Sequence, residues 1–255
     1  MVIKWKITYP AYTGEEKRNA YVYLPKEARR HPEKRYPVLY MFDGHNVFFD
    51  YDATYGKCWG MKEYMDKTKT PMIIAAVECN HSPHGGRLSE YSPFTFKNSM
   101  LGSIKGRGDE TMDWFVNVFK AEVDRRFPTI PDREHTYIAG SSMGGLMSLY
   151  AVLEYNHIFS KAAALSPSVW VAPKQMESLI LGANLAPNTT VYMDYGADEL
   201  SNHKNMAGSL SKIASLLFLK PVNLTFRTVP HGTHCEASWE RQIPFFINAL
   251  RYEEQ

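Results

Sequence analysis

A serine placed between two glycines is the residue of this sequence that is best suited to nucleophilic chemistry. Gly140, Ser142 and Gly144 satisfy the pattern G-x-S-x-G, between an apolar run at 137–139 and a helix-like run at 146–153. That order predicts a strand, a sharp turn and a helix, in which the serine hydroxyl is exposed above the edge of a sheet. A glycine-rich helix start or a phosphate-binding loop is the alternative interpretation of the same pattern.

Two late histidines could act as the base that such a serine requires. A serine hydroxyl is a weak nucleophile at neutral pH until a base accepts its proton, and a third group must fix the tautomer of that base. His231 and His234 lie in the loop after the apolar run at 223–229. We favour His234, because Gly232 lets the loop turn and His234 lies nearest the final helix. His231 is then a surface residue.

Two adjacent carboxylates could supply the third group. Asp198 and Glu199 follow the expected strand at 191–195 and the glycine that ends it, Gly196. They therefore come between the serine and the histidine, in the chain order of α/β-hydrolases. Adjacent side chains point in different directions, so we expect one of the two to reach the histidine. Asp194, inside the strand, is a weaker third candidate.

An oxyanion formed during attack on a carbonyl group needs preorganised N–H donors. One expected donor is the backbone N–H of Met143, the residue after the serine. The second should come from the loop after the apolar run at 37–42, around Gly44 and His45. Glycine gives access to the backbone there, although a plain turn would also explain the dipeptide of Asp43 with Gly44.

Two more residues are candidates for contact with a substrate. Arg87 lies in a long loop, and loops of this length inside compact domains are usually functional. It could hold a substrate carboxylate, although a structural pair with Glu90 is the simpler expectation. Trp170 could line an acyl or aromatic pocket, whereas most aromatic residues belong to the core.

A metal site is the main chemical alternative to nucleophilic catalysis. The residues that could cluster around an ion are His81, His84, His231, His234 and Cys235. Their spacing fits no zinc pattern well. We therefore expect neither a metal nor a cofactor.

Alternating strands and helices must position these groups. Such alternation indicates βαβ units, a mostly parallel sheet and helices on both of its faces. The candidates then meet at the carboxyl ends of the strands, where sites in such sheets lie. We expect strands at 2–9, 20–24, 37–42, 72–77, 136–139, 162–165, 191–195 and 223–229, and helices at 54–66, 109–126, 143–155, 174–182, 203–218 and 237–250. The first two strands should form an antiparallel hairpin through the polar residues 13–16.

Length and composition are those of an ordinary globular protein. The 255 residues favour one domain over 1–255, with 44% hydrophobic and 22% charged residues and a net charge of +2. This charge balance indicates no nucleic-acid partner. Three cysteines without a C-x-x-C motif argue against a disulfide framework and favour a reducing compartment. We find no signal peptide and no membrane-length apolar run, so we expect a cytoplasmic protein. The sequence leaves the oligomeric state open.

Beyond single motifs, the chain resembles the putative esterase family of α/β-hydrolases over nearly its whole length. This family includes esterase D, feruloyl and acetyl xylan esterases, enterochelin esterases and the mycolyltransferase antigens. The resemblance is carried by residues 40–46, Arg87 with 90–93, 131–136, 138–146 and 164–170, and by His234 with Trp239.

The resemblance implies a specific set of catalytic residues. Ser142 would be the nucleophile and His234 the base. The family's acid tends to lie three residues after a glycine that ends its strand, which corresponds to Glu199, with Asp198 as the alternative. The implied function is hydrolysis of a small acyl ester through an acyl-enzyme, without a cofactor. Alternatives are an acyltransferase or thioesterase with the same triad, and a catalytically silent binding member of the family.

Overall fold

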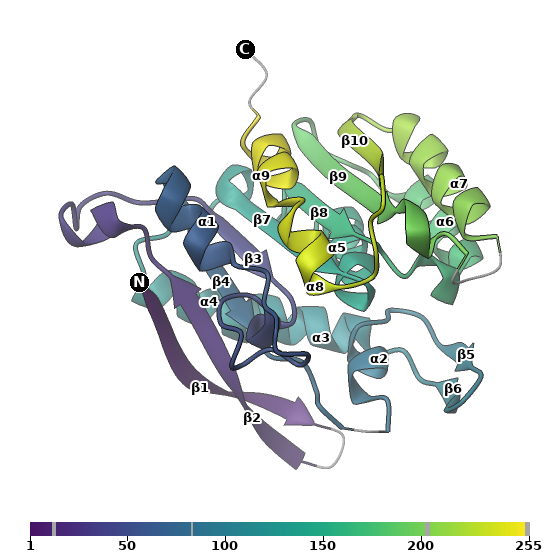
Figure 1. The fold of residues 1–255 in the computed structure, drawn as a ribbon, viewed down its shortest axis with the longest axis horizontal. Coiled ribbons are helices and arrows are strands. Elements are labelled where there is room, and N and C mark those ends of the chain that lie inside the picture. The colour runs from purple at the N-terminus through teal and green to yellow at the C-terminus, as the bar shows by residue number, and fades with distance from the viewer. Residues whose placement is uncertain (12–13, 83, 202–204, 253–255) are drawn as a thin grey trace.

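An eight-stranded sheet forms the centre of the molecule in our computed structural model, which describes all residues except 12–13, 83, 202–204 and 253–255 (Figure 1). The strand order is β1-β2-β4-β3-β7-β8-β9-β10. The strands are β1 (Val2–Ala11), β2 (Gly14–Tyr23), β3 (Val38–Met41), β4 (Ile73–Val77), β7 (Thr136–Ser141), β8 (Lys161–Leu165), β9 (Thr189–Gly196) and β10 (Val222–Val229). From β4 to β10 neighbouring strands are parallel, while β1 and β2 form an antiparallel hairpin and β2 is antiparallel to β4. The expected α/β-hydrolase-like fold, with its mostly parallel sheet and N-terminal hairpin, is confirmed.

Apolar runs fold into the central strands because both faces of the sheet are covered. Every residue of β3, β4, β7, β8 and β9 is buried, as is typical of parallel strands between two layers of helices. The edge strand β10 is mostly half-buried or exposed. The hairpin is longer than its apolar residues suggested, because the charged segment 16–18 also pairs with β1. The expected turn residue Thr13 lies outside the described residues.

Helices cover each face of the sheet and enclose a separate hydrophobic cluster (Figure 1). One face carries α3 (Gly108–Trp114), η3 (Phe115–Lys120), α4 (Ala121–Arg126), α5 (Met143–Glu154), α6 (Pro173–Gly182) and α7 (Met206–Phe218). The other face carries α1 (Met61–Thr68), α8 (Glu236–Glu240) and α9 (Ile243–Arg251). No helix among the described residues is both long enough and apolar enough to cross a bilayer.

Three helices differ from the expected ranges. The helix expected at 54–66 begins at Met61, because Gly56 and Gly60 have positive φ angles of 71° and 67° that interrupt a helix. The helix expected at 237–250 is divided into α8 and α9, with Pro244 in the first turn of α9. The helix expected at 203–218 begins at Met206, and its first two expected positions lie outside the described residues.

The segment between β4 and α3 was expected to be a loop and has structure of its own. It contains α2 (Gly86–Glu90) and a small hairpin of β5 (Phe96–Asn98) and β6 (Gly102–Ile104). A buried ion pair joins this segment to the hairpin at the sheet edge: Arg18 Nη2 lies 2.6 Å from Glu90 Oε1. Glu90 Oε2 also accepts a hydrogen bond from the backbone N–H of Asn80 at 3.1 Å. These contacts fix the segment beside the carboxyl ends of the strands.

Candidate active site

Ser142 occupies a strained turn between β7 and α5. Its backbone angles, φ 58° and ψ −121°, lie in a region that residues with a Cβ rarely adopt. The turn is tight, since a Cβ added at Gly140 would lie 2.6 Å from the carbonyl carbon of Gly144. The Ser142 N–H donates to the Leu165 carbonyl oxygen at 2.9 Å, and its Oγ lies 3.3 Å from Ser168 Oγ. Ser142 therefore lies on a tight turn from a strand into a helix, at the carboxyl end of β7.

A carboxylate is hydrogen-bonded to the favoured histidine. His234 Nδ1 lies 2.5 Å from Glu199 Oε2, with the Glu199 side chain 2% and the His234 side chain 35% exposed. Their loops meet at two glycines, because a Cβ on Gly196 would lie 2.3 Å from the carbonyl oxygen of Gly232. An Nδ1–H that donates to this carboxylate leaves Nε2 as the proton acceptor. The arrangement can therefore fix the tautomer that a general base requires.

Further hydrogen bonds hold the Glu199 carboxylate in place. Its Oε1 accepts from the Ser166 hydroxyl at 2.6 Å and from the Gly196 N–H at 2.9 Å. Ser166 Oγ in turn accepts from the indole N–H of Trp239 at 3.0 Å, and this indole meets the His234 ring edge-to-face at 5.1 Å. Sequence reasoning assigned no role to Ser166. Its position at the end of β8, beside the strand of the serine, is the signal that could have indicated one.

The other acid and base candidates lie elsewhere. The Asp198 side chain is exposed, and its backbone N–H donates to Gly232. Asp194 is buried and accepts a hydrogen bond from Tyr192 Oη at 2.6 Å, and this burial raises its pKa to about 6. His231 is exposed in a turn with a φ of 53°. Among the described residues, His234 is paired with Glu199, and neither Asp194 nor Asp198 is paired with it.

Ser142 and His234 line one cavity of about 480 Å³, at the end of the sheet where the parallel strands finish. Its walls are mostly polar, with the full lining comprising Asp43, His45, Asn46, Thr54, Tyr55, Cys79, Asn80, His81, Ser82, Arg87, Ser141, Ser142, His234, Glu236 and Trp239. No hydrogen bond joins Ser142 to His234 within the described part of the chain, as is common before a substrate binds. A larger cavity, about 590 Å³, lies at the opposite strand ends and contains none of the candidates.

The residues expected to stabilise an oxyanion lie around this turn. Met143 is the first residue of α5, and N–H groups of a first helical turn have no partner within the helix. Gly44 begins the short helix η2 (Gly44–Asn46), where a Cβ would lie 2.8 Å from the backbone of Val77. The end of β3 approaches the serine turn, because a Cβ at Gly144 would lie 3.4 Å from Asp43 Oδ2. The loop and the first turn of α5 are therefore neighbours.

Arg87 forms an ion pair with Asp43. The simpler prediction from the sequence, a pair of Arg87 with Glu90, is therefore wrong. Arg87 Nε lies 2.7 Å from Asp43 Oδ1, and Arg87 Nη2 lies 2.6 Å from Oδ2. Burial alone would raise the pKa of Asp43, but the paired guanidinium outweighs it and holds that pKa below its usual value. Glu90 pairs instead with Arg18. The correct partner, Asp43, lies just after the end of β3 and 44 positions earlier in the chain, so sequence proximity could not identify it.

Trp170 and His45 are the remaining residues for which the sequence predicted a role in the site. Trp170 is outside the cavity lining and packs edge-on against Phe96, with ring centroids 6.4 Å apart. His45 is 5% exposed and lines the cavity with its side chain, and burial lowers its pKa. The cavity also contains Glu236, whose pKa is raised by burial and whose Oε1 accepts from Asn46 Nδ2 at 3.3 Å. No motif had indicated Glu236.

The group of potential metal ligands in the structure differs from the group that the sequence suggested. Among the described residues, the potential ligand atoms of His81 lie near those of His45 and Cys79, and form no such group with the late histidines or with Cys235.

Comparisons with known proteins identify the family of this chain and proteins that share its fold. The sequence model of a family described as "Putative esterase" matches residues 12–249. A curated relative, the uncharacterized protein YbbA of Bacillus subtilis, is 23% identical over 168 residues, which are 64% of this chain. The match spans 62% of that relative's length.

Solved structures share the fold over almost the whole chain. A ferulic acid esterase has a TM-score of 0.68 at 18% identity, covering 98% of this chain and 97% of its own. An IroE-like serine hydrolase from Shewanella oneidensis has a TM-score of 0.73 at 17% identity, covering 98% and 79%. The S-formylglutathione hydrolase FrmB of Staphylococcus aureus has a TM-score of 0.63 at 17% identity, covering 98% and 96%.

Proposed function

Because the chain belongs to the putative esterase family, we propose that it is a serine carboxylic-ester hydrolase with Ser142 as nucleophile. The observation that carries the proposal is the hydrogen bond between Glu199 and His234, because the His234 side chain lines one cavity with Ser142, a serine on a strained turn. In serine hydrolases, a histidine paired with a carboxylate accepts the proton of the serine hydroxyl and so activates the serine.

The proposed reaction has two stages, formation of an acyl-serine and its hydrolysis. Ser142 Oγ attacks the acyl carbon and passes its proton to His234 Nε2, which then protonates the departing alcohol and leaves an acyl-serine. Water attacks this ester, gives its proton to His234, and the carboxylic acid leaves as the serine regains a proton. Glu199 stabilises the transient imidazolium, and the N–H groups of Met143 and of the loop at Gly44 and His45 stabilise the oxyanion.

The cavity favours a small ester with polar groups. Its volume of about 480 Å³ suits a ligand of modest size. Its walls contain the Asp43–Arg87 pair, Asn80 and Glu236. Long aliphatic groups of a substrate would gain little binding free energy from contact with such polar side chains. We therefore expect short or hydroxylated acyl and alcohol parts to react faster than long aliphatic ones.

Replacement of the serine tests the assignment. We expect Ser142→Ala to lower kcat on short p-nitrophenyl esters by about 10⁴-fold or more, since the members of such a triad act as a unit. Ser148→Ala is a matched control in the same helix, because Ser148 Oγ bonds the Gly144 carbonyl and lies outside the cavity lining. Unchanged turnover in folded Ser142→Ala protein would refute the proposal.

A labelling experiment separates an enzyme from a silent member of the family. A fluorophosphonate should attach to Ser142 in the parent protein and fail to label the Ser142→Ala variant. Substrate class can then be surveyed with feruloyl esters, S-formylglutathione and a siderophore ester, the substrates suggested by the names of similar structures. Added alcohols in the same assays would reveal acyl transfer by a second ester product.

A further inference from the structure

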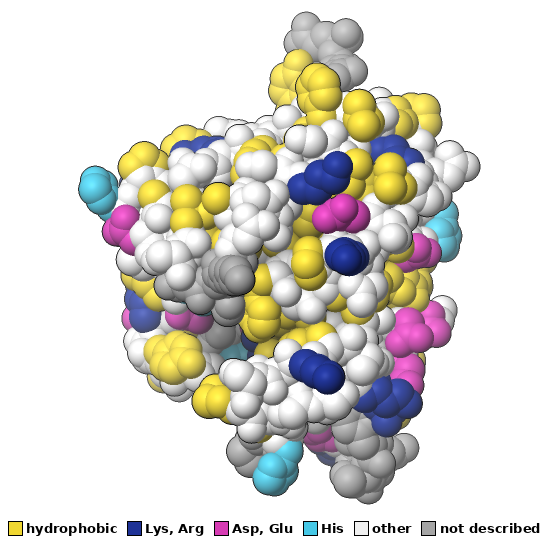
Figure 2. Space-filling view, turned by 90° about the vertical axis from the view of Figure 1, so that its right-hand side faces the viewer, with side chains coloured by type: hydrophobic (Ala, Val, Ile, Leu, Met, Phe, Trp, Pro, Cys, Tyr) yellow, Lys and Arg dark blue, Asp and Glu magenta, His cyan; other side chains and the backbone are white. Residues whose placement is uncertain are grey.

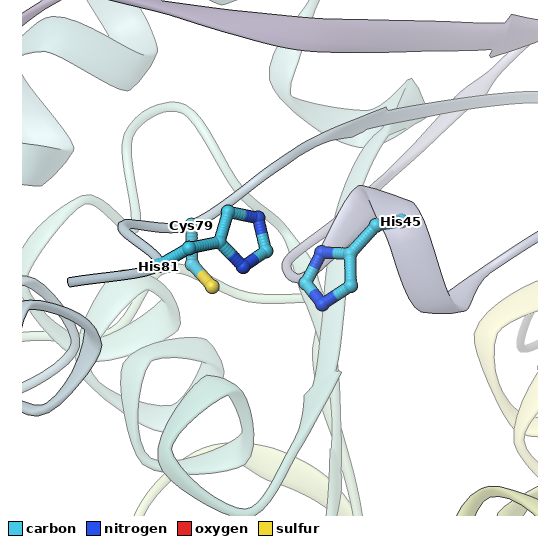
Figure 3. A group of neighbouring side chains, drawn as sticks. All are labelled: His45, Cys79 and His81. Atoms are coloured by element: carbon cyan, nitrogen blue, oxygen red, sulfur yellow. The ribbon is translucent and has the colours of Figure 1, made fainter. Parts of the chain in front are cut away.

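Two histidines and a cysteine converge on one side of the cavity. His45 comes from η2, and Cys79 and His81 come from the segment directly after β4. Figure 3 shows the three side chains pointing toward one another across the space between these segments. Their ligand atoms all lie within 4.8 Å of one another, and the two imidazole centroids are 4.6 Å apart.

The His45 ring has an unused nitrogen in a buried position. Its Nε2 lies 3.0 Å from Thr54 Oγ1, whereas its Nδ1 is buried and has no hydrogen-bond partner. A ring whose Nε2–H donates to Thr54 keeps its lone pair on Nδ1. A buried polar atom without a partner is costly, and metal-binding histidines are commonly oriented by such a hydrogen bond from the other nitrogen. The catalytic roles proposed above make no use of this Nδ1 atom.

We propose that His45, Cys79 and His81 bind a zinc-class divalent ion beside the esterase site. One thiolate and two imidazoles are ligands preferred by Zn²⁺ and Co²⁺, not by Mg²⁺ or Ca²⁺. Binding replaces the proton of the Cys79 thiol with the metal and releases that proton to solvent. Three protein ligands leave a fourth position for water or another small ligand.

The burial of the three residues suits a site that closes around the ion. Tetrahedral Zn²⁺ needs its ligand atoms about 3.5 Å apart, and those of this group lie within 4.8 Å of one another, so closure around an ion requires a contraction of little more than an ångström at most. His45 and Cys79 are 5% and 2% exposed and are held by their surroundings, whereas His81 is exposed and its side chain can move inward. His81 is therefore the ligand that completes the site.

Metal titration of the purified chain tests this proposal without measuring ester turnover. Zn²⁺ competed against a chromophoric chelator should bind with one ion per chain, and Co²⁺ should produce a thiolate-to-cobalt absorption band. Cys79→Ser should abolish the band, and His81→Ala should weaken Zn²⁺ binding by about 100-fold, as expected when a metal site loses part of its support. His81 is exposed, so its replacement should leave the fold intact by circular dichroism.

Cys235→Ser is the matched control. Cys235 lies next to the late histidines, the other place where a cysteine and imidazoles are close in sequence. We expect Cys235→Ser and Ser142→Ala to bind both ions like the parent. Loss of the cobalt band in Cys235→Ser, its survival in Cys79→Ser, or the absence of stoichiometric binding by the parent would each overturn the proposal. Failure of the esterase proposal would leave these metal results unaffected.

Discussion

Glu199 and Asp198 are neighbours in sequence with opposite environments. Glu199 is buried and bonded to His234, Ser166 and Gly196, whereas Asp198 is exposed. We expect Glu199→Gln to lower kcat by about 10³–10⁴-fold, because the neutral amide no longer stabilises the imidazolium or fixes its tautomer. Asp198→Asn should keep a rate close to the parent's. Steady-state kinetics of both variants on one short ester distinguish the two candidates. A larger loss of kcat in Asp198→Asn than in Glu199→Gln would assign the acid to Asp198.

Strain at the serine makes a prediction about stability. Positive φ at Ser142 costs free energy for a residue with a Cβ and little for glycine. We therefore expect Ser142→Gly to raise the free energy of unfolding by about 1 kcal/mol while it abolishes activity. Ser142→Ala retains the Cβ and should show no such gain. Urea denaturation of the three proteins is the measurement, and equal stability of the glycine and alanine variants would contradict the idea.

At the scale of elements, the Asp43–Arg87 pair connects the end of β3 to α2. The folded-state pKa of Asp43 is below its unfolded value, so the pair stabilises the fold at pH values above the unfolded pKa. This stabilisation is lost as the pH falls below about 4 and Asp43 is protonated. Arg87→Gln should therefore destabilise the protein at pH 7, and by progressively less as the pH falls from 4 toward 2.

Urea denaturation across this pH range provides the test. The pair of Lys34 with Glu27 is a suitable control, because both side chains are about half exposed and such surface pairs contribute little. Lys34→Gln should cost almost nothing at any pH. A stability difference between Arg87→Gln and the parent that stays constant from pH 7 to pH 3 would show that the ion pair is not its cause.

Sequence patterns predicted the elements whose signals are local. Apolar runs at 37–42 and 72–77 became buried strands, and the glycines around Ser142 identified its turn. The predicted start of α1 was wrong. Helical periodicity at 54–60 does not reveal that Gly56 and Gly60 adopt positive φ angles, which interrupt a helix. The break between α8 and α9 was missed although Pro244 marks it.

Contacts between distant parts of the chain could not be predicted in the same way. The partner of Arg87 is set by how α2 packs against the end of β3, and the nearer carboxylate of Glu90 is used by Arg18. The grouping of His45 with Cys79 likewise depends on β3 and β4 being parallel neighbours. Strand order, which no residue pattern encodes directly, therefore decides which side chains share the cavity.

The whole molecule is a sheet between two hydrophobic layers, and the smaller layer contains Phe246 of α9. Phe246 is fully buried and meets Trp59 at 6.1 Å and Tyr192 at 6.2 Å between ring centroids. We expect Phe246→Ala to lower the free energy of unfolding by about 3–5 kcal/mol, since the remaining space is walled by rigid rings. Thermal or urea unfolding measures the loss.

Phe218 provides the contrasting case on the opposite layer. It ends α7 with 79% of its surface exposed. Helix α7 lies on the right-hand side of Figure 1, and Figure 2 shows that on this side of the molecule hydrophobic side chains lie among charges of both signs. Phe218→Ala should change stability by no more than about 0.5 kcal/mol. Equal losses of unfolding free energy in Phe246→Ala and Phe218→Ala would mean that the burial of these side chains does not determine the loss.

The segment from Glu78 to Arg107 connects β4 to α3, and its described residues add no strand to the central sheet. It nevertheless supplies Cys79, His81 and Arg87 to the cavity, while Ser142 comes from the turn between β7 and α5. Under the proposed function, part of the cavity wall and the nucleophile are therefore encoded in separate stretches of the gene. We expect that exchange of this one stretch between relatives would alter substrate preference while the residues proposed for catalysis are retained.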